Sequence, residues 1–427
     1  MKISKLNIEQ YKHLENLDFD FTYQTGKRKG EPLDKICFIG QSATGKTNLL
    51  ELINKEIYRI NTAVVNQFNF SDELPEEILL CEIYFKYGKD KIILSDKKLN
   101  YNDKIFNLSY SGTFGNLIDS EHKKNNYFFK SNLISDNNID LFTKNPLDIF
   151  EKYHDLSVNK LLNGMMTNRS FPVIFDDKVD SKLWIYILSE ILEYRKKFNQ
   201  KMSELIHKGL LANTNKLSSE FKKWQKENPN KLEEFALKFN PIIEKLNLEV
   251  DIVNTEYSIP ISNKKNDEII PIQNTSTGTK GLLLTFLPLF KLDTKDAIIL
   301  MDEPERSLYP DMQMDLIEHY QNLAPDAQFI VATHSPFIAA SFEPDERFIL
   351  YFDEEGKVAV RRGSSPIGDD PNDMLKNDFG VNYYNKHGED AYKKYISLKQ
   401  ATANEKDPKK KKELLLETVK LGDAYNF

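Results

Sequence analysis

A phosphate-loop motif near the N-terminus constrains this chain more than any other feature. Residues 40 to 47 read GQSATGKT, which satisfies the pattern GxxxxGK[ST]. An apolar strand-like segment, Ile36 to Ile39, precedes the motif, and apolar residues recur at helical spacing after it. A strand, a glycine-rich loop and a helix in this order bind phosphate, so the predicted ligand class is a nucleoside triphosphate. A glycine-bearing turn before an ordinary helix is the alternative.

The residue types of the loop match the chemistry of a triphosphate. Gly40 and Gly45 let the backbone curl until its N–H groups face phosphate oxygens. Lys46 supplies a positive charge for the β- and γ-phosphates, and the Thr47 hydroxyl is a ligand for Mg²⁺. The expected nucleotide-binding residues here are Gly40, Gln41, Ser42, Ala43, Thr44, Gly45, Lys46, Thr47 and Asn48.

A second strand-like segment ends in two carboxylates. The apolar residues Ile298 to Met301 run directly into Asp302 and Glu303. A phosphate-loop ATPase needs such a pair at a strand end. There Asp302 would hold Mg²⁺ and Glu303 would orient the water that attacks the γ-phosphate. An acidic turn after a strand is the alternative.

A third strand-like segment, Phe329 to Thr333, ends in His334. The carboxyl ends of parallel strands meet at the edge of the sheet where ligands bind. We therefore expect His334 to lie near the carboxylate pair and to hydrogen-bond the γ-phosphate as a catalytic residue. An ordinary histidine at a strand end is the alternative.

Composition excludes several classes of protein. The 427 residues carry a net charge of −7, which argues against a wholly basic nucleic-acid coat but allows local basic patches. The longest nearly apolar run, Leu282 to Phe290, is too short to cross a bilayer, and the N-terminus lacks the apolar core of a secretory signal. Two cysteines and seven histidines show no metal-ligand spacing. We expect a cytoplasmic protein without a membrane segment.

The pattern along the chain predicts four parts. Strand-like segments around one helix occupy residues 1–145, the N-terminal lobe with the phosphate loop. Residues 146–247 are helical, because Trp184, Ile191, Phe198 and Leu205 repeat every seven residues. Strands return in a C-terminal lobe at residues 248–365. One of these predicted strands is Tyr257 to Ile261. Polar helices follow in residues 366–427.

A hydroxyl-rich segment separates the helical part from the carboxylate pair. Residues 275–281 read TSTGTKG and precede an apolar run, which places them at the start of a helix. A helix N-terminus offers free N–H groups and Ser or Thr hydroxyls to an anion. An ordinary Ser/Thr cap of an internal helix explains the segment equally well.

Taken in order, these motifs resemble those of ABC-type ATPases of the SMC, RecF and OLD branch, within the AAA family. The resemblance covers residues 1–62 and about 270–355. It implies an α/β fold, an ABC-type P-loop ATPase head with a mixed-sheet lobe and a parallel-sheet core, a short helical insert and C-terminal helices. The family's Leu-Ser-Gly-Gly signature is replaced here by Thr-Ser-Thr-Gly, which leaves the rate of hydrolysis open.

The resemblance also implies ATP and Mg²⁺ as cofactors and a composite site. Ser276 and Gly278 would form the signature that reaches the γ-phosphate bound to the opposite subunit, with Lys280 in the same segment. Ser307 and Leu308 would belong to the D-loop. ATP would then join two copies head to tail, as a homodimer or within a higher homo-oligomer.

Three functions remain open at this level. The module of a membrane transporter is disfavoured by the long helical insert. A RecF-like DNA repair or DNA-binding ATPase is the second. The third is a slow or partner-regulated ATPase that resembles the standalone subunits of Septu-like and PARIS-like antiphage systems. Such a subunit would act as sensor or scaffold for a separate effector nuclease encoded nearby, with DNA as a further candidate partner.

Overall fold

A computed structural model describes residues 1–65, 80–95, 98–107, 126–143, 173–368, 370–381 and 386–425. The chain forms two compact units, Met1–Gly368 and Asp369–Phe427, and each is described by itself. The phosphate loop, the carboxylate pair and His334 all belong to the first unit.

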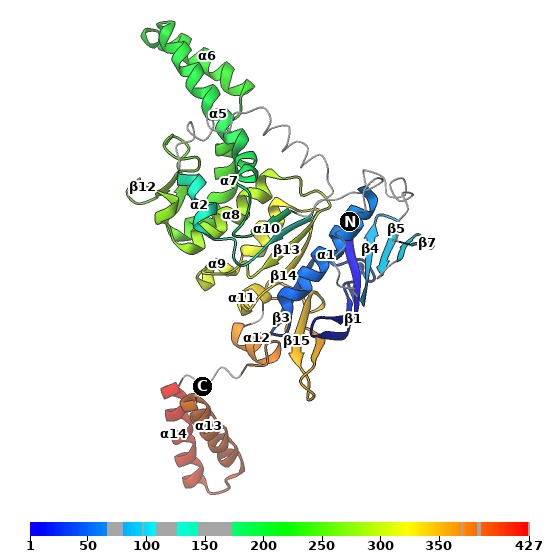
Figure 1. Cartoon of the computed structure of the whole chain (residues 1–427). Coiled ribbons are helices and arrows are strands. Elements are labelled where there is room, and N and C mark those ends of the chain that lie inside the picture. The colour runs from blue at the N-terminus through cyan, green and yellow to red at the C-terminus, as the bar shows by residue number, and fades with distance from the viewer. Residues whose placement is uncertain are drawn as a thin grey trace. The chain divides into compact units, whose positions relative to one another are not determined.

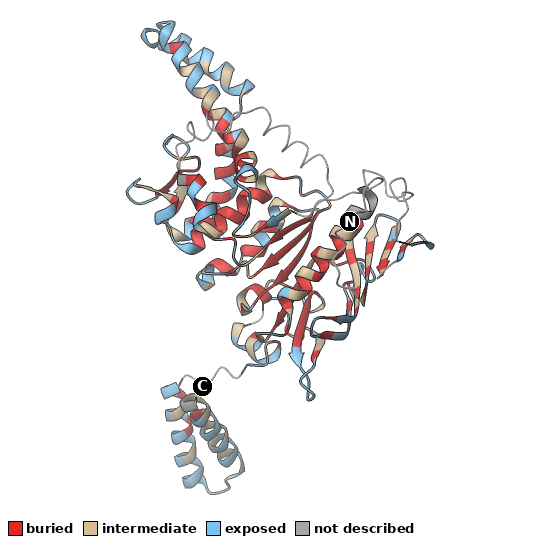
Figure 2. Ribbon diagram, viewed as in Figure 1, coloured by how far each residue is buried: buried red, intermediate tan, exposed pale blue. Residues whose placement is uncertain are grey.

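A seven-stranded sheet forms the centre of the first unit (Figure 1). Five neighbouring strand pairs are parallel, and only the edge strand β16 runs antiparallel to its neighbour. The central strands of this sheet are almost wholly buried (Figure 2). In spatial order the strands are β16 (Val358–Arg362), β15 (Arg347–Phe352), β3 (Lys35–Gly40), β14 (Gln328–Ala332), β13 (Ile298–Asp302), β8 (Asn126–Phe129) and β9 (Val173–Phe175).

A six-stranded antiparallel sheet lies beside it, and helix α1 (Lys46–Val65) packs between the two sheets. Leu49, Leu52 and Ile53 of α1 share one buried cluster with side chains from both sheets. The phosphate loop therefore leads into the helix that holds the two layers together. The second sheet runs β2 (Leu14–Asp20), β1 (Lys2–Tyr11), β4 (Leu80–Tyr87), β5 (Asp90–Ser95), β6 (Lys98–Tyr101) and β7 (Lys104–Asn107).

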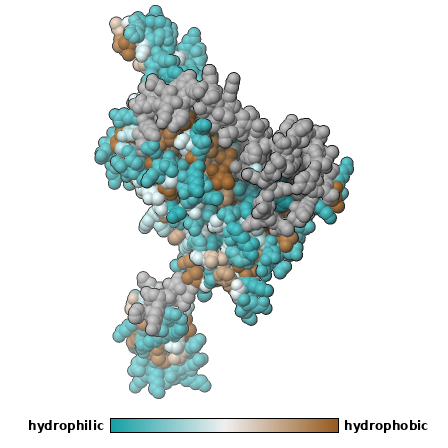
Figure 3. Space-filling model, viewed as in Figure 1, coloured by the Kyte–Doolittle hydropathy of each residue, from teal (hydrophilic) through white to brown (hydrophobic). Residues whose placement is uncertain are grey.

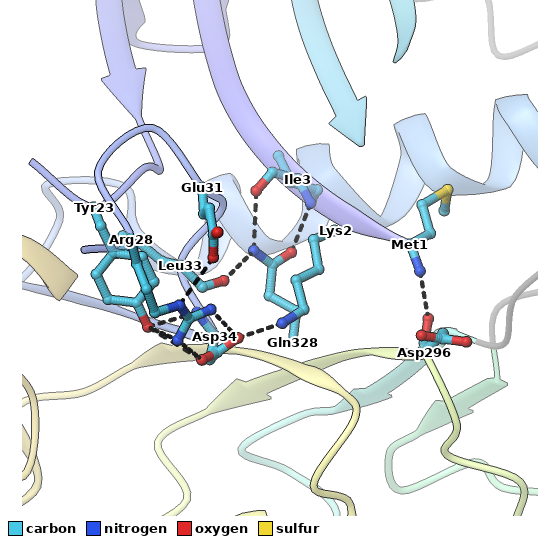
Figure 4. Close-up of polar contacts among 10 residues, drawn as sticks. All are labelled: Met1, Lys2, Ile3, Tyr23, Arg28, Glu31, Leu33, Asp34, Asp296 and Gln328. Atoms are coloured by element: carbon cyan, nitrogen blue, oxygen red, sulfur yellow. Dashed lines mark hydrogen bonds and ion pairs between the residues drawn. The ribbon is translucent and has the colours of Figure 1, made fainter. Parts of the chain in front are cut away.

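Polar contacts join β1 of the six-stranded sheet to the seven-stranded sheet (Figure 4). The fully buried Gln328 accepts from the backbone N–H of Ile3 at 2.7 Å and donates to the carbonyls of Ile3 and Leu33. Asp34, just before β3, accepts from Lys2 and Arg28. Burial opposes ionisation of Asp34, but the Arg28 and Lys2 contacts outweigh it and lower its pKa to about 2.

Helices and a three-stranded sheet, in the order β10, β11 and β12, complete the first unit. The fully buried Trp184 indole of α5 donates to Asn138 of α2 at 3.0 Å and so joins these two helices. The remaining bounds are α2 (Asp136–Thr143), α5 (Ser181–His207), η3 (Leu210–Ala212), α6 (Thr214–Glu227), α7 (Lys231–Ile243), η4 (Glu244–Leu246), β10 (Leu248–Val250), β11 (Ile261–Asn263), β12 (Ile269–Ile270), η5 (Ile272–Asn274), α8 (Thr277–Lys291), α9 (Pro310–Gln313), α10 (Leu316–Leu323), α11 (Pro336–Ala339) and η6 (Pro344–Glu346).

In its described residues the second unit contains three helices, α12 (Pro371–Asn377), α13 (Lys386–Asn404) and α14 (Pro408–Tyr425). Helices α13 and α14 pack against each other, and Lys394 pairs with Glu417 across them at 3.0 Å. No helix in the described part of the chain is both long and apolar enough to span a membrane.

The α/β class with a mixed lobe and a parallel core is confirmed by the strand pairing. Four strands, β6, β7, β9 and β16, were not predicted. β6, β7 and β9 are only three or four residues long, and β16 is a short edge strand with one buried residue, Val358. The predicted strand from Tyr257 to Ile261 is wrong, because β11 begins only at Ile261. Residues 144–172, where the helical insert was predicted to begin, lie outside the described residues, so the four-part division stays a prediction.

Candidate functional site

The phosphate loop joins the carboxyl end of β3 to the first turn of α1. Gly40, Ala43 and Gly45 have φ values of 145°, 68° and 93°. A Cβ on Gly40 would lie 2.1 Å from the Leu350 carbonyl oxygen on the neighbouring strand β15. One on Gly45 would lie 2.8 Å from Leu14 Cδ2. Gly40 is thus required by backbone conformation and by close packing against a neighbouring strand, and Gly45 by its backbone conformation.

Lys46 points back into its own loop. Its ammonium donates to the carbonyls of Gly40 at 2.9 Å and Gln41 at 3.0 Å, and its side chain is 6% exposed. Burial lowers its pKa to about 8, against the opposing effect of the carboxylates of Glu303 and Asp302. A buried cation held by carbonyl oxygens on this loop can exchange them for phosphate oxygens, which are stronger partners.

Thr47 meets Asp302 across the interface between α1 and β13. The threonine hydroxyl lies 3.1 Å from each carboxylate oxygen. Burial raises the Asp302 pKa to about 6, and the Thr47 hydrogen bond opposes this rise. A hydroxyl beside a carboxylate fits Mg²⁺, which takes oxygen ligands and usually adds phosphate oxygens. Among the described residues, no group of three or more His, Cys, Asp and Glu side chains could hold a metal ion unaided.

Glu303 and His334 face each other at the same edge of the sheet. Asp302 of β13 is in register with Ala332 of β14, and the Glu303 N–H donates to the Ala332 carbonyl at 2.8 Å. Glu303 Oε1 and His334 Nε2 are 3.8 Å apart, and both side chains are partly exposed. Burial, and then the charge of Lys46, lower the His334 pKa, which favours the neutral imidazole.

The hydroxyl-rich segment, residues 275–281, lies apart from the phosphate loop of the same chain. Ser276 caps α8 by accepting from the Thr279 N–H at 3.1 Å, as the alternative interpretation expected. A Cβ on Gly278 would lie 2.6 Å from the Ser307 carbonyl oxygen, so this glycine packs against the predicted D-loop of its own chain. Helices α1 and α8 lie on opposite sides of the large sheet (Figure 1). Among the described hydrogen bonds and ion pairs, none joins Ser276, Gly278 or Lys280 to the phosphate loop.

Asn48 has a structural partner. Its side-chain oxygen accepts from Lys12 Nζ at 2.9 Å, and Lys12 also pairs with Glu51 at 3.0 Å. These contacts fasten the turn between β1 and β2 to the first turns of α1. A direct role of Asn48 toward the nucleotide stays a prediction.

Sequence reasoning gave no role to Glu305, whose buried carboxylate holds the loop of His334. Glu305 Oε1 accepts from the Thr333 hydroxyl and from the His334 N–H, the latter at 3.1 Å. Burial raises the Glu305 pKa, although these hydrogen bonds oppose the rise. The only signal in the sequence was a second acidic residue two positions after Glu303.

Gln313 of α9 was also missed, and it joins the predicted D-loop to the same histidine loop. Its amide donates to the Leu308 carbonyl at 2.7 Å and accepts from the Ser335 hydroxyl. The Gln313 and Ser335 side chains are both buried. No spacing rule could have paired a glutamine with a serine 22 positions later.

Comparisons with known proteins agree with this chemistry. The profile of the AAA ATPase domain family matches residues 1–339. The chain is 22% identical to the Retron Ec83 probable ATPase of Escherichia coli over 82% of this chain and 71% of that protein. It is 25% identical to the Retron Vc95 probable ATPase of Vibrio cholerae over 55% of this chain and 44% of that protein. Septu protein PtuA of Bacillus thuringiensis is 33% identical over 72 residues, 17% of this chain and 18% of that protein.

Solved structures give a weaker likeness. The SMC head domain from Thermotoga maritima has a TM-score of 0.40 and 12% identity, covering 86% of this chain and all of that one. An SMC head bound to the C-terminal winged-helix domain of ScpA has a TM-score of 0.42 and 12% identity, covering 85% and 98%. These TM-scores are low, so the α/β assignment rests on the strand pairing described above.

Proposed function

The chain belongs to the AAA ATPase domain family, and from this premise we propose that it binds ATP with Mg²⁺, hydrolyses it slowly and pairs with a second copy around the nucleotide. The observation that carries the proposal is the meeting of Lys46, the Thr47–Asp302 pair and the Glu303–His334 pair at one edge of the parallel sheet. These are the parts that phosphoryl transfer requires: a phosphate cradle, a metal site and a group that positions water.

Each residue has a distinct task in this proposal. Lys46 and the loop N–H groups bind the β- and γ-phosphates, while Thr47 and Asp302 hold Mg²⁺. Bound Mg²⁺ would neutralise the charge that develops on the phosphates. Glu303 orients the attacking water, and the neutral His334 donates a hydrogen bond toward the γ-phosphate.

The position of the α8 N-terminus supports a composite site. Ser276 is exposed, and the first N–H groups of α8 offer an anion site that lies on the other side of the sheet from the phosphate loop. A second copy, related by a two-fold axis, can bring its phosphate loop to this N-terminus and receive the same in return. ATP would then bind between Lys46 of one copy and Ser276 of its partner.

We further propose that this ATPase is the sensor or scaffold subunit of an antiphage system with a separate effector nuclease. The support is the likeness to two retron ATPases and, over a short segment, to a Septu protein. Co-purification with the product of the neighbouring gene tests this part. Failure to form a complex, with and without ATP, would contradict it.

The Glu303→Gln variant tests the ATPase proposal. Glutamine keeps the size of the side chain but cannot polarise the water, so we expect ATP binding to persist, turnover to fall at least about a hundredfold, and dimers to accumulate. Light scattering after size exclusion with ATP and Mg²⁺ measures the dimer, and phosphate release measures turnover. Lys46→Ala is the matched control, which should remain monomeric. A monomeric Glu303→Gln protein with unchanged turnover would remove Glu303 from its role.

A further inference from the structure

Helices α5 and α6 form a hairpin, here called the arm (residues 181–227), that extends away from the sheets (Figure 1). Aromatic contacts join its two helices: the rings of Tyr194 and Trp224 are 5.8 Å apart, and those of Phe198 and Phe221 are 6.0 Å apart. These contacts settle which face of α6 packs against α5. The apolar face of α6 is therefore already used within the arm.

The opposite face of α6 carries a stripe of four exposed lysines, Lys216, Lys222, Lys223 and Lys226. At about 100° per residue, these positions fall within about 120° of arc and span about 15 Å along the helix axis. Figure 3 shows the outer end of the arm as mostly hydrophilic. In the described part of the chain, no ion pair or side-chain hydrogen bond involves these four ammonium groups.

The lysines of α5 behave differently. Lys197 pairs with Glu193 at 2.8 Å, and Lys201 pairs with Glu204 at 3.2 Å. Lys208, just after α5, also pairs with Glu204. Three lysines of the α5 side of the arm thus have carboxylate partners, whereas the four lysines of α6 have none among the described contacts.

The arm is positively charged on an acidic protein. Residues 181–227 contain ten Lys and Arg against five Asp and Glu, whereas the whole chain has a net charge of −7. A local positive field of this kind attracts a polyanion and repels basic surfaces. Two acidic residues, Glu220 and Glu227, lie at one border of the stripe, so its free side is the one that bears Lys222 and Lys226.

We propose that the lysine stripe of α6 binds the phosphate backbone of a nucleic-acid duplex. A span of about 15 Å covers about four base-pair steps, so several ammonium groups can reach phosphates at once. Membrane binding needs a free apolar helix face, and that of α6 is packed on α5. A protein partner needs aromatic or aliphatic anchors, but Ser218, Ser219 and Gln225 accompany these lysines.

The experiment compares two variants with the same change in charge. In the first, Lys216, Lys222, Lys223 and Lys226 are each replaced by glutamine, which preserves helix propensity. In the control, the exposed Lys409, Lys410, Lys411 and Lys412 of α14 are replaced in the same way. Fluorescence anisotropy with DNA and RNA duplexes of about 30 base pairs, at about 50 and 200 mM salt, measures binding.

We expect the wild type to bind duplex with an affinity that falls steeply as salt rises. The α6 variant should lose at least tenfold in affinity, and its salt slope should decrease by about 3–4, while the control changes less than about twofold. Preference for DNA or RNA identifies which duplex is bound. Absence of wild-type binding at low salt, or equal losses in both variants, would overturn the proposal.

The proposal can fail independently of the proposed ATPase function. Binding of a fluorescent ATP analogue, measured on the same preparations, should be equal in the wild type and both variants, because α6 contributes no residue to the phosphate loop. Circular dichroism should also be equal, since the four side chains are exposed. A loss of duplex binding with nucleotide binding intact assigns the effect to the arm.

Discussion

At the scale of single residues, the ionised Asp302 that the proposed Mg²⁺ site needs lowers the stability of the folded protein. The residue is 7% exposed, and burial raises its pKa to about 6. In the unfolded chain an aspartate ionises near pH 4, so between about pH 4 and 6 the unfolded state gives up its proton first. The stabilisation provided by the protonated group is present below about pH 4 and is lost as pH rises through about 6. Above that pH the folded protein retains a costly buried charge.

Asp302→Asn should therefore raise the free energy of unfolding by about 3 kcal/mol at pH 7.5, measured without Mg²⁺ or nucleotide. Asparagine keeps an oxygen that can accept from Thr47 but carries no charge. Thermal and denaturant unfolding between about pH 4 and 7.5 should show a flatter dependence than the wild type. The same variant should lose Mg²⁺-dependent ATP binding.

Glu303→Gln serves as the matched control for this stability effect. Glu303 is adjacent in sequence and has the same charge, but its side chain is 38% exposed. Its replacement should change the free energy of unfolding much less than that of Asp302. Equal gains in both variants would show that general repulsion at the strand end, rather than burial of Asp302, sets the cost.

At the scale of elements, a buried polar bridge connects the ends of β13 and β14. Glu305 holds the loop of His334, and Gln313 of α9 links the Ser335 hydroxyl to the Leu308 carbonyl. Since Gly278 of α8 packs against Ser307, a movement at the start of α8 can reach His334 through this bridge. Packed elements joined by hydrogen bonds of this kind are the physical basis of coupling between sites.

Gln313→Leu tests this coupling. Leucine has similar volume but leaves the Leu308 carbonyl and the Ser335 hydroxyl without this partner, so we expect a loss of about 1–3 kcal/mol in the free energy of unfolding. The kcat for ATP should fall several-fold with little change in KM, because the histidine loop and not the phosphate cradle is disturbed.

The exposed Gln225→Leu provides the control, in which both quantities should stay near wild type. Steady-state phosphate release gives kcat and KM. A raised KM with an unchanged kcat for Gln313→Leu would show that the bridge supports nucleotide binding rather than the position of His334.

At the scale of the whole molecule, the proposed site requires two copies of the chain. Lys46→Ala disables the phosphate loop, and Ser276→Arg blocks the α8 N-terminus. Two copies of the same variant then have no complete site at which ATP could join them. A heterodimer restores one complete site, because each copy supplies the part that the other lacks.

Mixing the two inactive variants in equal amounts should restore up to about half of wild-type turnover, since a mixed pair has one of its two sites intact and a pair of identical copies has none. Phosphate release of the mixture against that of each variant alone measures the effect. A double variant, Lys46→Ala with Ser276→Arg, mixed with the wild type is the control that supplies no new complete site. Absence of restoration would contradict a site shared between copies.

The sequence by itself determined which residues stand at the strand ends of the candidate site, because its motifs are local. The loop from Gly40 to Thr47, the pair Asp302 and Glu303, and His334 each lie within or directly after a single strand. Short-range rules of backbone conformation and apolar periodicity act on such segments, and they placed these residues at strand ends correctly.

Only the tertiary structure decided how distant segments pair. The position of β3 between β15 and β14, the Lys12–Asn48 contact and the bridge through Gln313 join residues far apart in the chain. Burial of Asp302, which sets its pKa, depends in the same way on packing around the strand end. Such contacts depend on the free energy of the whole packed arrangement rather than on any pattern within one segment, so no local rule predicts them.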